Sequence, residues 1–68
     1  MNIEEKKIAV LIDGDHADGK LIGFILTEAA KFGRVTIKRI YADFTTQNMN
    51  TWKNQLNINA IRPIQKFA

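Results

Sequence analysis

Carboxylates and a histidine are grouped at one point near the start of the chain. Asp13 and Asp15 flank Gly14, and the single histidine, His16, follows directly. Carboxylate oxygens bind hard cations such as magnesium, and a bound cation can activate water or stabilise a phosphoryl group. These residue types indicate metal-dependent phosphate chemistry, with Asp13 and Asp15 as candidate catalytic residues and Asp13 as a candidate metal ligand.

This acidic group follows a run of aliphatic residues that is typical of a buried parallel strand. Residues 8–12 are all apolar, and we expect a strand over Lys7 to Ile12. In open α/β sheets, ligands bind just beyond the carboxyl ends of the strands. The strand therefore places Asp13 at the mouth of a site, and its apolar side chains require cover on both faces.

A helix and a second strand are expected next. Asp18 is suited to cap a helix whose apolar stripe runs over residues 21–30, and Gly33 is suited to a left-handed stop. Residues 34–42 alternate in polarity, as in a strand with unequal faces. Asp43 follows at the same edge of the sheet and is the second candidate metal ligand.

The remaining sequence predicts a short helix and a third strand. Thr45 or Thr46 can cap a helix that ends near Leu56, and residues 60–67 read as a strand that contains Pro63. Proline cannot donate a ladder hydrogen bond, so this strand belongs at an edge of the sheet.

The predicted fold class is α/β, with a three-stranded parallel sheet built as β-α-β-α-β in the order 3-2-1. A βαβ crossover of this length makes the strands that it joins parallel, and the crossover itself is right-handed. Residues 1–68 show no internal boundary and form one domain. The first strand keeps an unpaired aliphatic edge, which natural folds pair or cover. We therefore expect a homo-oligomer, or a complementing second half, to pair through that edge.

Composition narrows the function classes. The 68 residues include no cysteine and no serine, which excludes disulfides, thiolate metal sites and a serine nucleophile. No signal peptide and no bilayer-spanning run is visible, so a cytoplasmic location without membrane contact is expected. The net charge of +3 fits a polyanion such as RNA, although the basic residues are scattered.

Three residues near the acidic group are candidates for nucleic-acid binding. His16 and Lys20 are expected to contact phosphate, and Phe44, in the turn beside Asp43, is the candidate for stacking on a base. His16 has a second interpretation as a loop histidine that only stabilises the turn.

Other known acidic or glycine-rich motifs fit less well. A calcium-binding helical loop would need an oxygen ligand where Ala17 stands and a glutamate where Phe24 stands. A haloacid dehalogenase phosphatase also begins with a strand and Asp-x-Asp, but it expects Thr or Val at the position of Ala17. The glycines lack the spacing of a dinucleotide fingerprint or a P-loop.

The sequence resembles the amino-terminal half of the NYN domain, in the bacterial LabA-like branch of the PIN-like nuclease superfamily. The segments that carry the resemblance are residues 8–15, 33–37, 39–43, 52–53 and 60–65. The resemblance implies a Rossmann-like sheet of order 3-2-1-4-5 and a metal-dependent ribonuclease site lined by acidic residues, with magnesium, or manganese in its place, as the cofactor.

Within that resemblance, Asp13 matches the first metal-binding aspartate of the family. Asp43 matches an aspartate that follows the second strand. Asp15 lies in the same motif as Asp13. The family continues after that aspartate with asparagine, and His16 stands in its place in this chain. The family's remaining acidic motifs follow the third strand, beyond residue 68. We therefore expect half of a PIN-like Rossmannoid domain, a weakly held metal, and no activity or very weak activity for this short chain. The alternative is a non-catalytic interaction, oligomerisation or RNA-binding module.

Overall fold

The computed structural model of the chain describes residues 6–46 and 49–67. Its elements are β1 (Lys7–Asp13), the 3-10 turn η1 (Gly19–Leu21), α1 (Ile22–Ala30), β2 (Arg34–Ala42), α2 (Asn50–Ile58) and β3 (Arg62–Gln65). The predicted α/β fold with three strands and two helices is confirmed.

The three strands form one parallel sheet. Asp13 at the end of β1 aligns with Tyr41 in β2, and Ile40 in β2 aligns with Pro63 in β3. The structure gives the order β1-β2-β3, where the sequence predicts 3-2-1. Both descriptions place β2 in the centre, and they differ in the edge from which the sheet is read. Pro63 accordingly lies in an edge strand.

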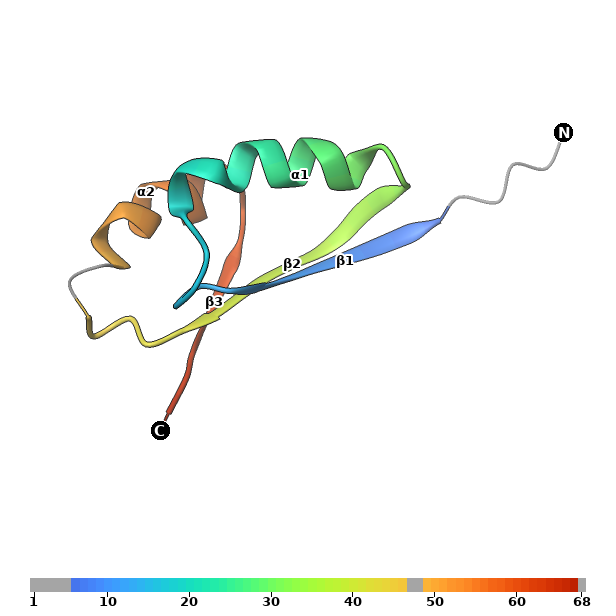
Figure 1. Cartoon of the computed structure of the whole chain (residues 1–68). Helices are drawn as coiled ribbons and strands as arrows, with labels where there is room; N and C mark the ends of the chain where they lie inside the picture. The colour runs from blue at the N-terminus through green and yellow to red at the C-terminus, as the bar shows by residue number, and fades with distance from the viewer. Residues whose placement is uncertain (1–5, 47–48, 68) are drawn as a thin grey trace, which may run out of the picture.

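Both helices lie on the same face of the sheet, α1 over β1 and β2 and α2 beyond them toward β3 (Figure 1). The burial of β1 follows this arrangement, because Ile12 on the helical side is buried while Leu11 on the other side is 62% exposed. The expected cover on both faces is therefore present on one face only within the described ranges. None of the described helices is long and apolar enough to cross a membrane.

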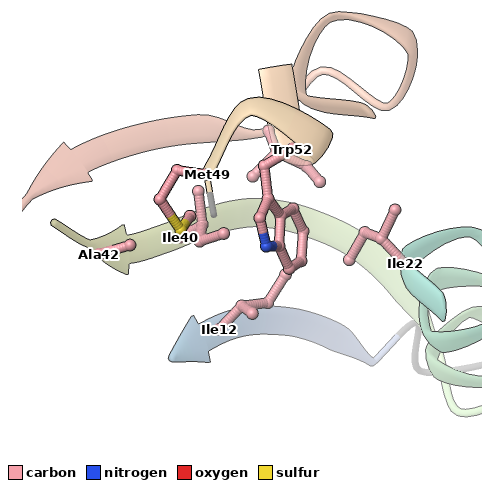
Figure 2. Packing of buried hydrophobic residues seen from close by; sticks show 7 residues of the cluster. Ile12, Ile22, Ile40, Ala42, Met49 and Trp52 are labelled. Carbon is pink, nitrogen blue, oxygen red and sulfur yellow. The ribbon is translucent and has the colours of Figure 1, made fainter. Parts of the chain in front are cut away.

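The core lies between the sheet and the two crossovers. Trp52 points from α2 toward the sheet, with its ring beside Ile12 and Ile22 (Figure 2). Ile22 and Ile40 are completely buried, and Trp52 is 2% exposed. Burial of a large aromatic side chain removes much apolar surface from water, so this one residue ties the second crossover to the first strand.

The structure confirms the predicted helix cap at Asp18 but not the predicted helix stop at Gly33. The side chain of Asp18 accepts a hydrogen bond from the backbone N–H of Lys20 at 2.9 Å, which confirms it as the N-cap of η1. The left-handed stop at Gly33 is wrong, because no described glycine has a positive φ. A Cβ at Gly33 would instead collide with the carbonyl oxygen of Lys6, which also accepts from Arg34 N–H. Gly33 therefore permits a close approach of two backbones.

The second helix begins later than predicted. Neither Thr45 nor Thr46 caps it, because both hydroxyls donate to Asp43 instead, and the N-cap position is Met49. Residues 47–48 lie outside the described ranges.

The third strand is also shorter than predicted, because α2 continues into a C-terminal turn. Ile61 N–H donates to Leu56 O at 2.9 Å and Ala60 N–H donates to Asn57 O at 3.4 Å, which is a Schellman motif. Ala60 occupies its left-handed position with φ 53°.

Candidate functional site

Two acidic turns meet at the carboxyl edge of the sheet. The first begins at Asp13, the last residue of β1, and is fixed to β2 by a hydrogen bond from Gly14 N–H to Tyr41 O at 2.9 Å. Asp15 N–H donates to Asp13 Oδ1 at 3.3 Å, so one carboxylate oxygen of Asp13 stabilises its own turn. Asp13 is exposed, as a ligand that receives a cation from solvent must be.

The turn at Gly14 leaves no room for a side chain. A Cβ at that position would lie 2.6 Å from Cδ1 of Ile40 and 2.9 Å from Cβ of Ala42. Both neighbours are completely buried, so they have no free space into which to move. The absence of a side chain at Gly14 therefore lets the acidic turn pack directly on the central strand.

Asp15 joins the first turn to the second turn and to the residue after β3. Its Oδ1 accepts a hydrogen bond from Asp43 N–H at 3.2 Å, and its Oδ2 lies 3.3 Å from Nζ of Lys66. The ion pair is accessible to solvent, so its contribution to stability is about 0–1 kcal/mol. Its structural effect is to hold the Asp15 carboxylate between the ends of β1, β2 and β3.

Asp43 is held by hydrogen bonds that favour its charged form. Its Oδ1 accepts from Thr45 Oγ1 at 2.5 Å, from Gln65 Nε2 at 3.0 Å and from Thr45 N–H at 3.0 Å. These bonds, led by that of the Thr45 hydroxyl, lower the pKa of the Asp43 carboxyl below its usual value. Asp43 is therefore a carboxylate at neutral pH, and one of its oxygens is fully occupied.

Asp15 lines two hollows. The larger has a volume of about 360 Å³, within the range of small-molecule sites, and the smaller about 220 Å³. The larger is lined by Gly14, Asp15, Ala17, Asp18, Gly19, Thr46, Met49 and Trp52. The smaller is lined by Asp15, Asp43, Lys66 and Phe67. Both combine a carboxylate with an apolar wall, and Asp13 lies outside both linings.

The described residues do not by themselves fit a metal centre. Within the described ranges, no three side chains among histidine, cysteine, aspartate and glutamate are grouped closely enough to hold a metal ion. Asp15 is engaged with Asp43 N–H and Lys66, and Asp43 with Thr45 and Gln65. The structure brings the predicted acidic residues to one edge but does not make them converge on one point.

The three residues predicted to contact nucleic acid differ in their exposure to solvent. His16 and Lys20 are exposed. The backbone N–H of His16 donates to Asp13 O in the first turn, and that of Lys20 donates to Asp18 Oδ1 at the start of η1. Phe44 is half-buried and packs against the core, so its ring is not free on both faces. Phe67, which lines the smaller hollow, is 85% exposed and is the better placed aromatic ring.

Three residues of the site were missed by the sequence reasoning: Thr45, Gln65 and Lys66. Gln65 receives Phe44 N–H on its Oε1 at 3.0 Å and donates to Asp43 from its Nε2, so it connects β3 to the second acidic turn. The usable signal is position, because the end of a third parallel strand must reach the same edge as the ends of the first two.

Comparison with known proteins agrees with this geometry. Residues 7–68 match the family described as the NYN domain, which confirms the resemblance identified in the sequence. No curated protein and no solved structure is significantly similar to the chain.

Proposed function

The chain belongs to the NYN domain family, and we propose that it supplies part of the acidic site of a metal-dependent ribonuclease. In this proposal Asp13 is the residue offered to the cation, and Asp15 and Asp43 are accessory groups. Groups outside the described residues complete the site. The chain alone is inactive on RNA, or very weakly active.

The observation that carries the proposal is the meeting of Asp13, Asp15 and Asp43 at the carboxyl ends of adjacent parallel strands. Asp43 N–H binds the carboxylate of Asp15, so the two acidic turns are in direct contact. Hydrolysis of a phosphodiester by bound cations needs several carboxylates that converge on them. The described residues provide such carboxylates at one edge without that convergence, which supports a contributing role and not a complete centre.

Asp13 is assigned the principal role because its carboxylate is the least engaged of the three. The structure gives it one hydrogen bond, from Asp15 N–H at 3.3 Å, and leaves it exposed. Asp15 and Asp43 are instead held by neighbours from other strands, which suits groups that fix the shape of the site. His16 and Lys20, exposed beside the first turn, are the proposed contacts to RNA phosphate.

The test combines cation binding with RNA cleavage. Magnesium or manganese is titrated into the isotope-labelled chain, and backbone NMR shifts are followed. We expect weak binding with shifts centred on residues 13–16, lost in Asp13→Asn and retained in the control Glu28→Gln. Glu28 is a matched carboxylate on α1, paired with Lys31 away from the acidic edge.

Cleavage of labelled single-stranded RNA is measured with the same proteins. We expect no cleavage, or slow cleavage that Asp13→Asn removes. Efficient cleavage by the wild-type chain would contradict the incomplete site, and magnesium shifts that ignore Asp13 would contradict the role of that residue.

A non-catalytic interaction module is the second candidate. The observation that favours it is the face of β1 opposite the helices, where the Leu11 side chain is 62% exposed.

A further inference from the structure

The larger hollow lies between the turns that follow β1 and β2. Its lining comes from the first acidic turn and Gly19 of η1, and from Thr46, Met49 and Trp52 of the second crossover. No lining residue belongs to a strand, so a fourth strand beside β1, as in the family's sheet order, would leave the lining unchanged. The volume of about 360 Å³ is enough for one small planar molecule.

A hydrogen-bond donor without a partner reaches this hollow. Trp52 is 2% exposed, and its indole N–H has no hydrogen-bond partner among the described residues. Within the described ranges, no fully buried side-chain nitrogen or oxygen lacks a partner, so solvent must reach the indole nitrogen. That nitrogen lies on the side of the ring toward the carboxyl ends of the strands, and Trp52 lines the hollow there (Figure 2). Because indole N–H groups in protein interiors usually have an acceptor, this one is available to a ligand.

The indole offers the hollow its edge and not its face. Gly19 covers one side of the ring, because a Cβ there would lie 3.2 Å from Cδ2 and 3.3 Å from Cε2 of Trp52. Ile12 and Ile22 lie beside the ring (Figure 2). A ligand therefore meets the N–H of Trp52 and does not stack on it. Met49 provides an apolar part of the lining.

The other polar side chains of the lining are hydrogen-bond acceptors. Asp18 Oδ1 accepts Lys20 N–H at 2.9 Å, and Asp18 Oδ2 has no partner among the described residues. A carboxylate has about four acceptor sites, so both oxygens can still accept. Asp15 adds a second carboxylate, and Thr46 Oγ1 already donates its proton to Asp43 O at 3.0 Å. The two negative charges disfavour a phosphate group and favour a neutral ligand rich in N–H donors.

We propose that this hollow binds a guanine base. The Watson–Crick edge of guanine carries the acceptor O6 beside two donors, N1–H and the N2 amino group. O6 accepts from the Trp52 indole N–H, and the two donors bind the Asp18 carboxylate as a pair. Adenine and cytosine present one amino group beside a ring acceptor, and uracil one N–H between two carbonyls. Each of these three would turn a lone pair toward the carboxylate.

The source of the base rests on the proposed function. Asp15 lines the hollow and also binds the second acidic turn, so the hollow adjoins the proposed site of phosphate chemistry. An RNA strand that crosses the acidic edge would bring one of its bases to the hollow. Binding of the base needs neither a cation nor bond cleavage, so it is measured separately from both.

The test follows the indole N–H signal by NMR during titrations without metal ions. Trp52 is the sole tryptophan, so the chain gives one such signal. Guanosine should shift it. Adenosine, and inosine, which lacks the N2 amino group, should bind about tenfold or more weakly. A uridine-rich pentaribonucleotide with one central guanine should bind more tightly than guanosine monophosphate, and the reverse order would overturn RNA as the source of the base.

Variants of the chain separate recognition from folding. Asp18→Asn keeps a good helix cap and removes the charged acceptor, so guanosine affinity should fall about tenfold or more while the urea midpoint stays close to that of the wild-type chain. Trp52→Phe removes the N–H and retains an aromatic ring, and its guanosine affinity, measured from the backbone shifts of residues 14–19, should also fall. Glu28→Gln makes the same charge change as Asp18→Asn on α1 and should leave guanosine affinity unchanged.

Three results would overturn the proposal. They are an indole signal that guanosine does not move, equal affinities for all of these nucleosides, and an unchanged guanosine affinity in Asp18→Asn. Failure of magnesium binding or of RNA cleavage would count against the proposed function alone, because the nucleoside titrations contain neither a cation nor a cleavable bond between nucleotides.

Discussion

Replacement of Gly14 by alanine should destabilise the fold through a steric clash with the central strand. A Cβ at this position would lie 2.6 Å from Ile40 Cδ1, 2.8 Å from Ile40 Cγ1 and 2.9 Å from Ala42 Cβ. Gly14 has no positive φ, so alanine can adopt its backbone conformation and the clash is the only cost. The Ile40 and Ala42 side chains are completely buried, which leaves them no room to adjust.

The expected loss is about 1–3 kcal/mol, the usual range for forcing an extra methyl group into a packed core. At roughly 0.05–0.15 kcal/mol per residue, a domain of this size has a total stability of only about 3–10 kcal/mol. Gly14→Ala should therefore remove a large fraction of the free energy of unfolding. In urea, with a slope near 1 kcal/mol/M for so small a chain, the midpoint should fall by about 1–3 M.

Urea unfolding is followed at one protein concentration by far-UV circular dichroism and by the emission of Trp52. Gly23→Ala is the matched control, since a Cβ there meets no atom within 4 Å and Gly23 lies inside α1. That control should gain up to about 1 kcal/mol from helix propensity. Adding Ile40→Val to Gly14→Ala removes the nearest clashing atom and should recover part of the loss. Equal midpoints for Gly14→Ala and the wild-type chain would refute the reasoning.

Two further predictions concern a helix end and an acidic turn. Ala60→Gly should stabilise the chain by about 1 kcal/mol, because Ala60 has φ 53° in a Schellman position that favours glycine; a lower urea midpoint would contradict this. Hydrogen bonds lower the pKa of Asp43, so their stabilisation is complete above the ordinary value of 3.8 and is lost as the pH falls through the lowered one. Thr45→Val should raise that pKa toward 3.8, which carboxyl NMR titration measures; an unchanged pKa would exclude the hydroxyl as the cause.

The positions of the strands and of the acidic turns could be predicted because both follow from local pattern and chain handedness. The aliphatic run of β1 and the alternation of residues 34–42 define strands, and a crossover of this length fixes their parallel direction. Parallel strands end at one edge, so Asp13 and Asp43 had to share it.

Features that depend on close contacts between distant segments were not predictable. Gly33 is required by the approach of Lys6, and nothing in the local sequence distinguishes that role from a helix stop. Phe24 lies within the apolar stripe expected for the first helix, yet its ring is 66% exposed, because only part of that broad stripe faces the sheet.

The partners of the site carboxylates could not be predicted from the sequence either. Hydrogen bonds from Gln65 and Thr45 engage Asp43, and Lys66 engages Asp15, so the carboxylates point to neighbours and not to a common centre. Side-chain direction at the end of a strand depends on partners far away in the chain, and spacing alone does not contain that information.

The position of Trp52 makes it an intrinsic fluorescence probe of the candidate site. It is the sole tryptophan, it is 2% exposed, and its indole lies against Gly19 in the lining of the larger hollow, which Asp15 also lines. Indole emission shifts with the polarity of its surroundings. A molecule that enters this hollow would therefore change the wavelength and intensity of the protein's own fluorescence without any attached dye.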